Sequence, residues 1–92
     1  MADPVRDNTE QHRFELDADG HLAVSYYEFA GDVITFKHTE VPKELEGRGI
    51  GSRLVRGELE IARSRGLKVI AKCPFVAAYI AKHPEFADLL KK

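Results

Sequence analysis

A glycine-rich segment joins a β-like stretch to a strongly helical one near the middle of the chain, and it limits the possible folds more than any other feature. Its glycines stand at alternate positions: Gly47, Gly49 and Gly51. Glycine lacks a Cβ, so it adopts positive φ without steric cost and lets the backbone approach a ligand closely. A helix start leaves several N–H groups without internal partners and carries partial positive charge. The segment therefore predicts a strand–loop–helix unit with a phosphate or pyrophosphate site at the start of the helix.

Two common phosphate-binding motifs do not match this loop. The dinucleotide fingerprint requires G-x-G-x-x-G, whereas the glycines from Gly47 to Gly51 read G-x-G-x-G. A Walker A loop requires a lysine after its last glycine, but Ser52 follows Gly51. Because glycine spacing alone is a weak signal, a strand-to-helix turn without a ligand remains the alternative interpretation.

Composition argues against several classes of protein. The chain has 92 residues and a net charge of −1, which suits one small domain and lacks the basic excess of a general nucleic-acid binder. No apolar run approaches the ~18 residues that span a bilayer, and the polar N-terminus lacks the apolar segment of a secretory signal. The single cysteine, Cys73, rules out an internal disulfide, and the four histidines lack metal-ligand spacing. We therefore expect a cytoplasmic protein without metal, nucleic acid or membrane partners, most simply a monomer, with a weak dimer as the alternative.

Apolar residues at every second position mark three strands in the first half of the chain. Residues 1–10 are almost entirely polar, so we expect a flexible tail there and a single domain over residues 11–92. The three alternating runs, at residues 14–17, 22–26 and 33–41, are separated by short turns. This pattern predicts an antiparallel three-stranded meander.

The periodicity becomes helical after Pro42. Apolar residues then recur at three- to four-residue intervals and Gly66 provides a stop signal, which predicts a helix over residues 50–65. Residues 67–72 form a fourth β-rich run directly after it. If this strand lies parallel to the third, the segment is a right-handed β-α-β crossover.

Two short helices are predicted at the end of the chain, over residues 75–82 and 84–90. They are separated at His83, because the residue before a proline is driven out of helical geometry. The predicted fold class is therefore α/β, more strictly α+β: a three-stranded meander, a β-α-β crossover and short C-terminal helices.

Several segments of the chain resemble the N-acetyltransferases of the GNAT superfamily. Residues 46–51 are similar to that family's pyrophosphate loop, [QR]-x-x-G-x-[GA], although Glu46 departs from its first position. A subgroup of very small members carries His-Thr-x-Val-Pro before the loop and Cys-Pro-[FY]-[VA] after the next strand. Residues 38–42 and 73–76 match these two segments. The likeness covers residues 12–90 and implies a GNAT-like fold.

The resemblance also implies acetyl-CoA as the donor and an amine as the acceptor. Backbone N–H groups of the loop would hold the pyrophosphate, with Arg48 or Arg53 adding positive charge. The third and fourth strands would splay apart to admit the cofactor, and an N–H near Val41 would polarise the thioester carbonyl. The pantetheine arm would pair with the backbone of Thr39, Glu40 and Val41. The residues expected around the pyrophosphate are Gly47, Arg48, Gly49, Ile50, Gly51, Ser52 and Arg53.

Cys73 and Tyr79 are the candidates at the sulfur end of the cofactor, and both are expected to contact it. A thiolate is a strong nucleophile once its pKa falls, so Cys73 could form an acetyl-cysteine intermediate. The alternative is a buried thiol that only packs beside the cofactor. In related enzymes a tyrosine on the following helix protonates the departing CoA sulfur, and Tyr79 resembles that residue. Its alternative role is core packing.

His38 and Glu40 are the candidates for a general base. They lie two positions apart on one strand, so their side chains point to the same face. Either could take a proton from the attacking ammonium, while the alternative is a polar edge on a solvated sheet face. We therefore expect an acetyl-CoA-dependent N-acetyltransferase, with a non-enzymatic acyl-CoA-binding module as the alternative.

Overall fold

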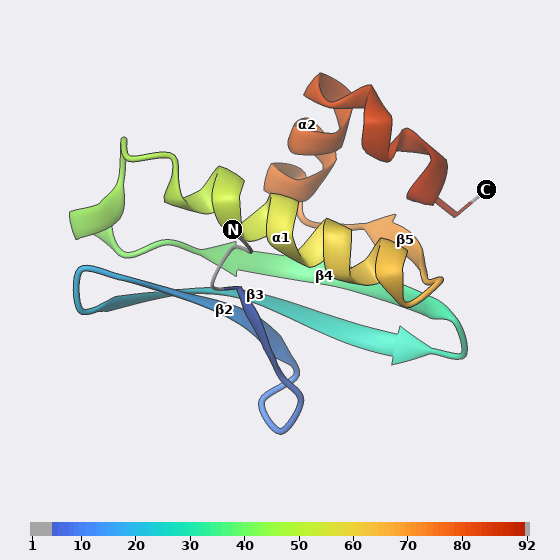
Figure 1. The fold of residues 1–92 in the computed structure, drawn as a ribbon, viewed down its shortest axis with the longest axis horizontal. Helices are drawn as coiled ribbons and strands as arrows, with labels where there is room; N and C mark the ends of the chain where they lie inside the picture. The colour runs from blue at the N-terminus through green and yellow to red at the C-terminus, as the bar shows by residue number, and fades with distance from the viewer. Residues whose placement is uncertain (1–4, 92) are drawn as a thin grey trace.

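A five-stranded sheet carries both helices on one of its faces (Figure 1). The computed structural model describes residues 5–91. The strands, which lie in sequence order across the sheet, are β1 (Arg6–Asn8), β2 (Arg13–Ala18), β3 (His21–Ala30), β4 (Val33–Glu40) and β5 (Lys68–Ala71). The helices are α1 (Ile50–Ser64) and α2 (Pro74–Lys82), with 3-10 helices η1 (Lys43–Leu45) and η2 (Pro84–Leu89).

The pairing of the strands confirms the predicted meander and crossover. Strands β2, β3 and β4 are antiparallel neighbours, and β5 runs parallel to β4. Helix α1 lies between β4 and β5 in the chain and packs over the sheet (Figure 1). The mixed α+β architecture predicted from the sequence is therefore correct.

The hydrophobic core lies between the sheet and the two helices. Every second residue of β2 and of the first half of β4 points into it, and α1 contributes an apolar stripe at helical spacing. The register of β4 against β3 shifts after Phe36, so that Thr39 rather than His38 or Glu40 points to the helical side. The fully buried side chains include Phe14, Leu16, Ile34, Phe36, Leu54, Val55, Leu59 and Val76. Burying a side chain of this size contributes about 1.5–3 kcal/mol each, so this interface dominates the stability of the domain.

Gly66 stops helix α1 just after its C-cap residue Arg65, as the sequence predicts. The glycine has φ of 70°, and the two hydrogen bonds that close the helix end run from Leu67 N to Ala62 O and from Gly66 N to Arg63 O. These are the bonds of a Schellman motif, which only a residue tolerant of positive φ closes easily. The motif reverses the chain directly into β5.

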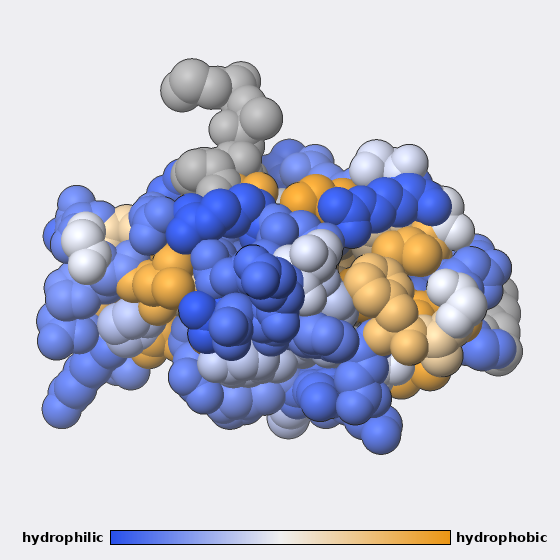
Figure 2. All heavy atoms as spheres, turned by 90° about the horizontal axis from the view of Figure 1, so that it is seen from below, coloured by the Kyte–Doolittle hydropathy of each residue, from blue (hydrophilic) through white to orange (hydrophobic). Residues whose placement is uncertain are grey.

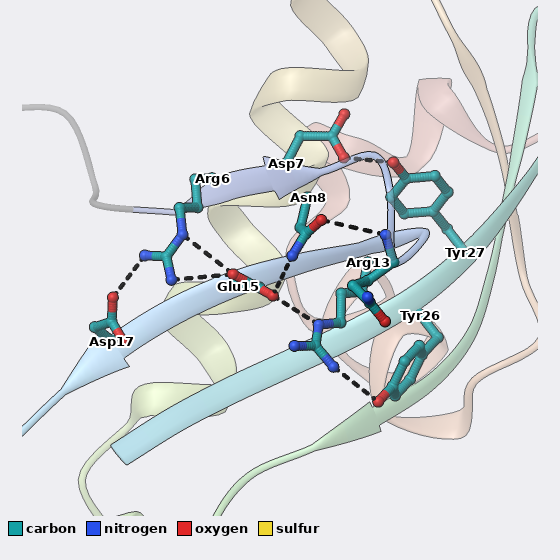
Figure 3. A network of polar contacts seen from close by, with 9 residues as sticks. Arg6, Asp7, Asn8, Arg13, Glu15, Asp17, Tyr26 and Tyr27 are labelled. Carbon is teal, nitrogen blue, oxygen red and sulfur yellow. Dashed lines mark hydrogen bonds and ion pairs between the residues drawn. The ribbon is translucent and has the colours of Figure 1, made fainter. Parts of the chain in front are cut away.

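The N-terminal segment differs from the prediction, because residues 6–8 form the edge strand β1 rather than part of a tail. Their lack of apolar side chains is offset by polar contacts to β2 and β3 (Figure 3). On the open face, Arg6 and Asn8 bond the buried carboxylate of Glu15 at 3.1 and 2.9 Å. On the helical face, the Tyr27 hydroxyl donates to Asp7. Residues 5–10 therefore belong to the folded domain, and residues 1–4 lie outside the described part of the chain.

The face of the sheet opposite the helices is largely hydrophilic (Figure 2). Ion pairs along it join neighbouring strands, such as Arg6 with Asp17 and Lys37 with Glu28. Arg13 bonds Glu15 at 2.6 Å and lies over the ring of Tyr26. No helix covers this face within the described residues, so it is a solvated surface.

The contacts of Asp7 generate a prediction about stability. In Asp7→Ala the buried Tyr27 hydroxyl loses its acceptor and Arg65 loses an ion pair of 2.8 Å. We expect the free energy of unfolding in urea to fall by about 1–3 kcal/mol, the cost of an unsatisfied buried polar group. The matched control is Asp17→Ala, which removes only an exposed pair with Arg6 and should change stability little. Equal effects of the two variants would contradict the anchoring role of β1.

Candidate active site

The glycine loop places the start of α1 at the surface without any capping side chain. Gly47 and Gly49 have φ of 82° and 72°, a backbone conformation that favours glycine. Gly49 is the N-cap residue, no side chain bonds the first-turn N–H groups, and that turn carries no acidic residue among the described ones. Since first-turn N–H groups have no partner within a helix, these donors and the helix dipole can act on an anion.

Gly51 is required for a different reason, namely close packing against Phe75. A Cβ at this position would lie 2.7 Å from the Cζ atom of the Phe75 ring. The ring itself is 44% exposed, which is unusual for phenylalanine. It stands between two adjoining surface hollows, one at the glycine loop and one beside α2.

The two hollows have volumes of about 220 and 210 Å³, and both are lined by Ser52 and Phe75. The first also involves Val41, Leu45, Glu46, Gly47, Gly49, Ile50 and Gly51. The second also involves Ala78, Tyr79, Lys82 and His83. The two hollows therefore follow the loop, with the uncapped start of α1 at one end and α2 at the other.

Charged side chains surround the loop without filling it. Arg48 pairs with Asp19 of the β2–β3 turn, so its charge is shared with a carboxylate. Arg53 is exposed on the first turn of α1, and Glu46 is exposed beside Gly47. The predicted positive rim therefore consists of Arg53 and an Arg48 that already shares its charge with a carboxylate.

Strand β4 extends beyond its partner β5. The parallel pairing ends at Phe36, whose carbonyl accepts from the N–H groups of both Lys72 and Cys73, at 3.1 and 3.0 Å. The remaining residues of β4 pair only with β3, so no strand lies along their other edge within residues 5–91. The backbone of Thr39 to Val41 is therefore left with one open edge.

Cys73 lies at the bottom of this separation as the N-cap residue of α2. Its side chain is 3% exposed, and its Sγ lies 3.4 Å from Thr39 Oγ1. Burial raises the pKa of the thiol, but the Thr39 hydroxyl and the N–H groups of Val76, Phe75 and Thr39 outweigh it, so the pKa falls below its usual value. The amides of Phe75 and Val76 belong to the first turn of α2, where no side chain forms a capping hydrogen bond. The site therefore stabilises the thiolate more than the surroundings of an ordinary cysteine do.

Tyr79 lies further along α2 with its ring buried and held by neighbours. The ring stacks on His83 with centroids 4.0 Å apart and is tilted against Phe86 at 6.2 Å. It also lines the second hollow, beside Ser52 and Phe75. Tyr79 therefore combines a packing role with a position at the edge of the candidate site.

His38 and Glu40 lie on the opposite, open face of the sheet. Their side chains are more than half exposed and pair with each other, with 3.2 Å between His38 Nε2 and Glu40 Oε2. Thr39, the residue between them, points to the helical side and meets Cys73. The structure thus brings together Thr39 and Cys73, and it separates the two candidate bases from the thiol by the thickness of the sheet.

Comparison with known proteins identifies the family. A sequence model of GCN5-related N-acetyltransferases matches residues 13–89. The chain belongs to this family. A GCN5-like putative N-acetyltransferase of Staphylococcus aureus, whose structure was solved by NMR, superposes on this chain with a TM-score of 0.72. The two are 30% identical, and the match covers 95% of this chain and 86% of that one.

The chain is also similar to vertebrate proteins named NATD1. Mouse NATD1 is 29% identical over 83 residues, which is 87% of this chain and 76% of the mouse protein. Human NATD1 is 33% identical over 63 residues, which is 67% of this chain and 56% of the human protein. The GNAT likeness recognised from the loop and the Cys-Pro segment is therefore confirmed.

Two polar residues of the GNAT core were missed in the sequence. Glu58 of α1 and Ser25 of β3 are both completely buried near Cys73. The sequence did contain a signal, because Glu58 follows Leu54 by four positions and so occupies the apolar face of the helix. The residues near it, Ser25 and Cys73, come from distant parts of the chain and carry no such signal.

Other kinds of site receive no support from the described residues. Residues 5–91 hold no group of three or more His, Cys, Asp or Glu arranged to bind a metal. None of the helices in that range is long and apolar enough to cross a membrane.

The thiol environment generates a prediction about titration. In Thr39→Val the hydroxyl that stabilises the thiolate is lost while the backbone N–H and the side-chain shape remain. We expect the pKa of Cys73 to rise, as followed by the carbon-13 shift of its Cβ against pH. Thr35→Val, on the same strand but beside neither Cys73 nor the loop, is the matched control and should leave the titration unchanged. A Cys73 pKa that stays constant in Thr39→Val would remove the threonine from the site.

Proposed function

We propose that this protein transfers an acetyl group from acetyl-CoA to an amine. The observation that carries the proposal is the order of three features: the uncapped start of α1 lies in one hollow with Val41, Val41 follows the open edge of β4, and Thr39 on that edge contacts the Cys73 thiol. A nucleotide diphosphate, an extended amide-containing arm and a thioester occur in the same order in acetyl-CoA. Membership of the GCN5-related N-acetyltransferase family supports the same donor.

The loop fits the diphosphate of the donor. Gly47 and Gly49 leave the backbone bare, because no atom lies within 4 Å of the position a Cβ would take. The N–H groups from Gly47 to Ser52 would bind the diphosphate oxygens, with Arg53 adding charge. The loop therefore supplies most of its donors from the backbone.

The open edge of β4 fits the pantetheine arm, which carries amides that can pair like an added strand. Thr39, Glu40 and Val41 would supply the backbone partners. An N–H near Val41 would donate to the thioester oxygen as negative charge develops on it. Positioning of the thioester would then account for much of the rate enhancement.

The thiol of Cys73 is our candidate nucleophile. Its sulfur attacks the thioester carbonyl, the bond between that carbon and the CoA sulfur breaks, and the acetyl group is carried by Cys73. Tyr79 provides the proton for the departing sulfur. The amine then attacks the acetylated cysteine, which releases the Cys73 thiolate and the acetylated product.

His38 and Glu40 suit a role on the acceptor side. They lie on the open face, where an amine can approach the separated ends of β4 and β5 from solvent. Because the sheet lies between them and Cys73, either side chain would accept the proton of an attacking ammonium through water. In a direct transfer without acetyl-cysteine, the same pair would act as the base.

A second function, acyl-CoA binding without transfer, is favoured by the small exposure of the thiol. Only 3% of Cys73 is accessible, which suits a packing role beside the ligand. The two functions share the glycine loop and differ in whether an acetyl group leaves CoA.

The loop can be tested by calorimetry with CoA. Gly49→Ala forces a side chain into a backbone with φ of 72° at the helix start, whereas Gly31→Ala imposes the same strain at φ of 62° in the β3–β4 turn. We expect similar losses of stability, but a Kd for CoA at least tenfold higher only in Gly49→Ala, or about 1.4 kcal/mol. Undetectable binding of CoA to the unmodified protein, or equal Kd values in both variants, would refute the loop as its site.

The nucleophile can be tested by mass spectrometry after mixing with acetyl-CoA. The unmodified protein should gain one acetyl group at Cys73 and lose it on addition of an amine. Cys73→Ser should bind CoA with a similar Kd but form no thioester, and turnover should fall by about a hundredfold or more. Retained turnover in Cys73→Ser would favour direct transfer, and absence of both acetylation and turnover would favour the binding module.

A further inference from the structure

A buried carboxyl group interrupts the apolar core beside the candidate site. Glu58 of α1 is 0% exposed, and neither of its carboxyl oxygens has a hydrogen-bond partner among the described residues. The hydroxyl of Ser25, also 0% exposed, is equally unpartnered within residues 5–91. A buried polar group without a partner costs stability, and an isolated buried charge costs far more. The cluster therefore requires a physical explanation.

The cluster connects Glu58 to the Cys73 sulfur. Ser25 of β3 is the direct cross-strand neighbour of Thr39 on β4, so both side chains point to the helical side. Thr39 Oγ1 lies 3.4 Å from Cys73 Sγ. Glu58 is close enough to Cys73 for a charge on the sulfur to raise the pKa of the carboxyl. Helix α1, two strands and the start of α2 thus each contribute one polar group to the same interior region.

We propose that Glu58 is a positioning residue that shares one buried proton with the Cys73 thiol. The inference rests on the proposed function, because it assigns the charge state of the same nucleophile. When the thiolate forms, the S–H bond of Cys73 breaks and the proton passes to a carboxylate oxygen of Glu58. When the amine later displaces the thiolate from the acetyl group, Glu58 returns the proton to sulfur.

Burial of the thiol explains why an internal acceptor is needed. With 3% of Cys73 exposed, water has little access to take or return its proton. Two negative charges in this interior would repel each other in a medium of low polarity. The cluster therefore holds at most one negative charge, which resides on either the sulfur or the carboxylate.

The proton affinities of the two groups converge. Burial raises the pKa of Glu58 well above its usual value, a charge on Cys73 raises it further, and Ser25 lowers it. The pKa of Cys73 is lowered by the contacts described above. The two shifts bring the pKa values toward each other, and ionisable groups that interact titrate as a pair.

Other groups on the elements around Glu58 act elsewhere. Tyr27 of β3 is buried, but its hydroxyl donates to Asp7 of the edge strand β1. Tyr79 of α2 is stacked on His83. From β4 the group that faces the cluster is the uncharged Thr39. Cys73 is the titratable group whose charge raises the pKa of Glu58.

The first test is a carbon-13 NMR titration of the Cys73 Cβ and the Glu58 carboxyl. In the unmodified protein both signals should report the same two steps, with the carboxyl titrating far above pH 4.5. In Glu58→Gln the carboxylate that opposes the thiolate is absent, so the Cys73 midpoint should fall by about one pK unit or more and become a single step. The control is Glu60→Gln, an exposed neighbour paired with Arg56, and should leave the midpoint unchanged.

Stability against pH gives a second readout, independent of acetyl transfer. With its pKa raised in the folded state, Glu58 keeps a proton that the unfolded chain releases above about pH 4.5, so stability falls as pH rises through that range. Glu58→Gln should flatten this slope, and Glu60→Gln should retain it. A slope that is unchanged in Glu58→Gln overturns the proposal.

The two proposals fail in different ways. If Glu58→Gln does not fold, the unmodified protein still decides, because a Glu58 carboxyl that titrates near pH 4.5 overturns the shared proton. Coupled titration without acetylation of Cys73 would support the shared proton while removing acetyl transfer. Acetylation with a pH profile that is identical in the unmodified protein and in Glu58→Gln would support transfer and overturn the role of Glu58.

Discussion

The unequal lengths of β4 and β5 determine the form of the site. β4 has eight residues, but the parallel pairing covers only Val33 to Phe36, because Pro74 starts α2 directly after Cys73. Proline cannot donate to a sheet and suits the first position of a helix, so the chain leaves the sheet there. Two consequences follow from this one departure. The edge of β4 from Thr39 onward is left open, and the thiol is placed where this edge begins, beside the first amides of a helix.

The second requirement is a helix start that reaches the same opening. α1 is oriented by its apolar stripe, which packs on β2 and β4, so its position does not depend on the loop before it. Gly47 and Gly49 then connect β4 to this fixed helix through two residues of positive φ, and Gly51 lets Phe75 of α2 lie against the first turn. Helix α1 therefore serves both purposes: its apolar side packs in the core, and its first turn presents the backbone N–H groups that would hold a diphosphate.

Much of this arrangement could be predicted from the sequence, because it is encoded locally. Alternation gives β2 to β4, the run from Ile50 to Gly66 gives α1 and its Schellman end, and the Cys-Pro step gives the start of α2. β1 could not be predicted in this way, since Arg6, Asp7 and Asn8 show no apolar alternation and are held by contacts to Glu15 and Tyr27. Alternation also put His38 and Glu40 on one face, but only the cross-strand register reveals that this is the face away from Cys73.

The buried cluster at Glu58 is the point at which local consistency breaks down. An apolar residue at this position would suit both the helix and the core, whereas a carboxyl with two unpartnered oxygens lowers the stability of a small domain. Departures of this kind are concentrated at functional sites, where a strained or unsatisfied group serves chemistry rather than folding. Here the departure lies beside the only thiol of the chain and shares its polar neighbours. A proton held jointly by sulfur and carboxyl accounts for both features, because a neutral Glu58 is tolerable in the core and an ionised one accompanies a protonated Cys73.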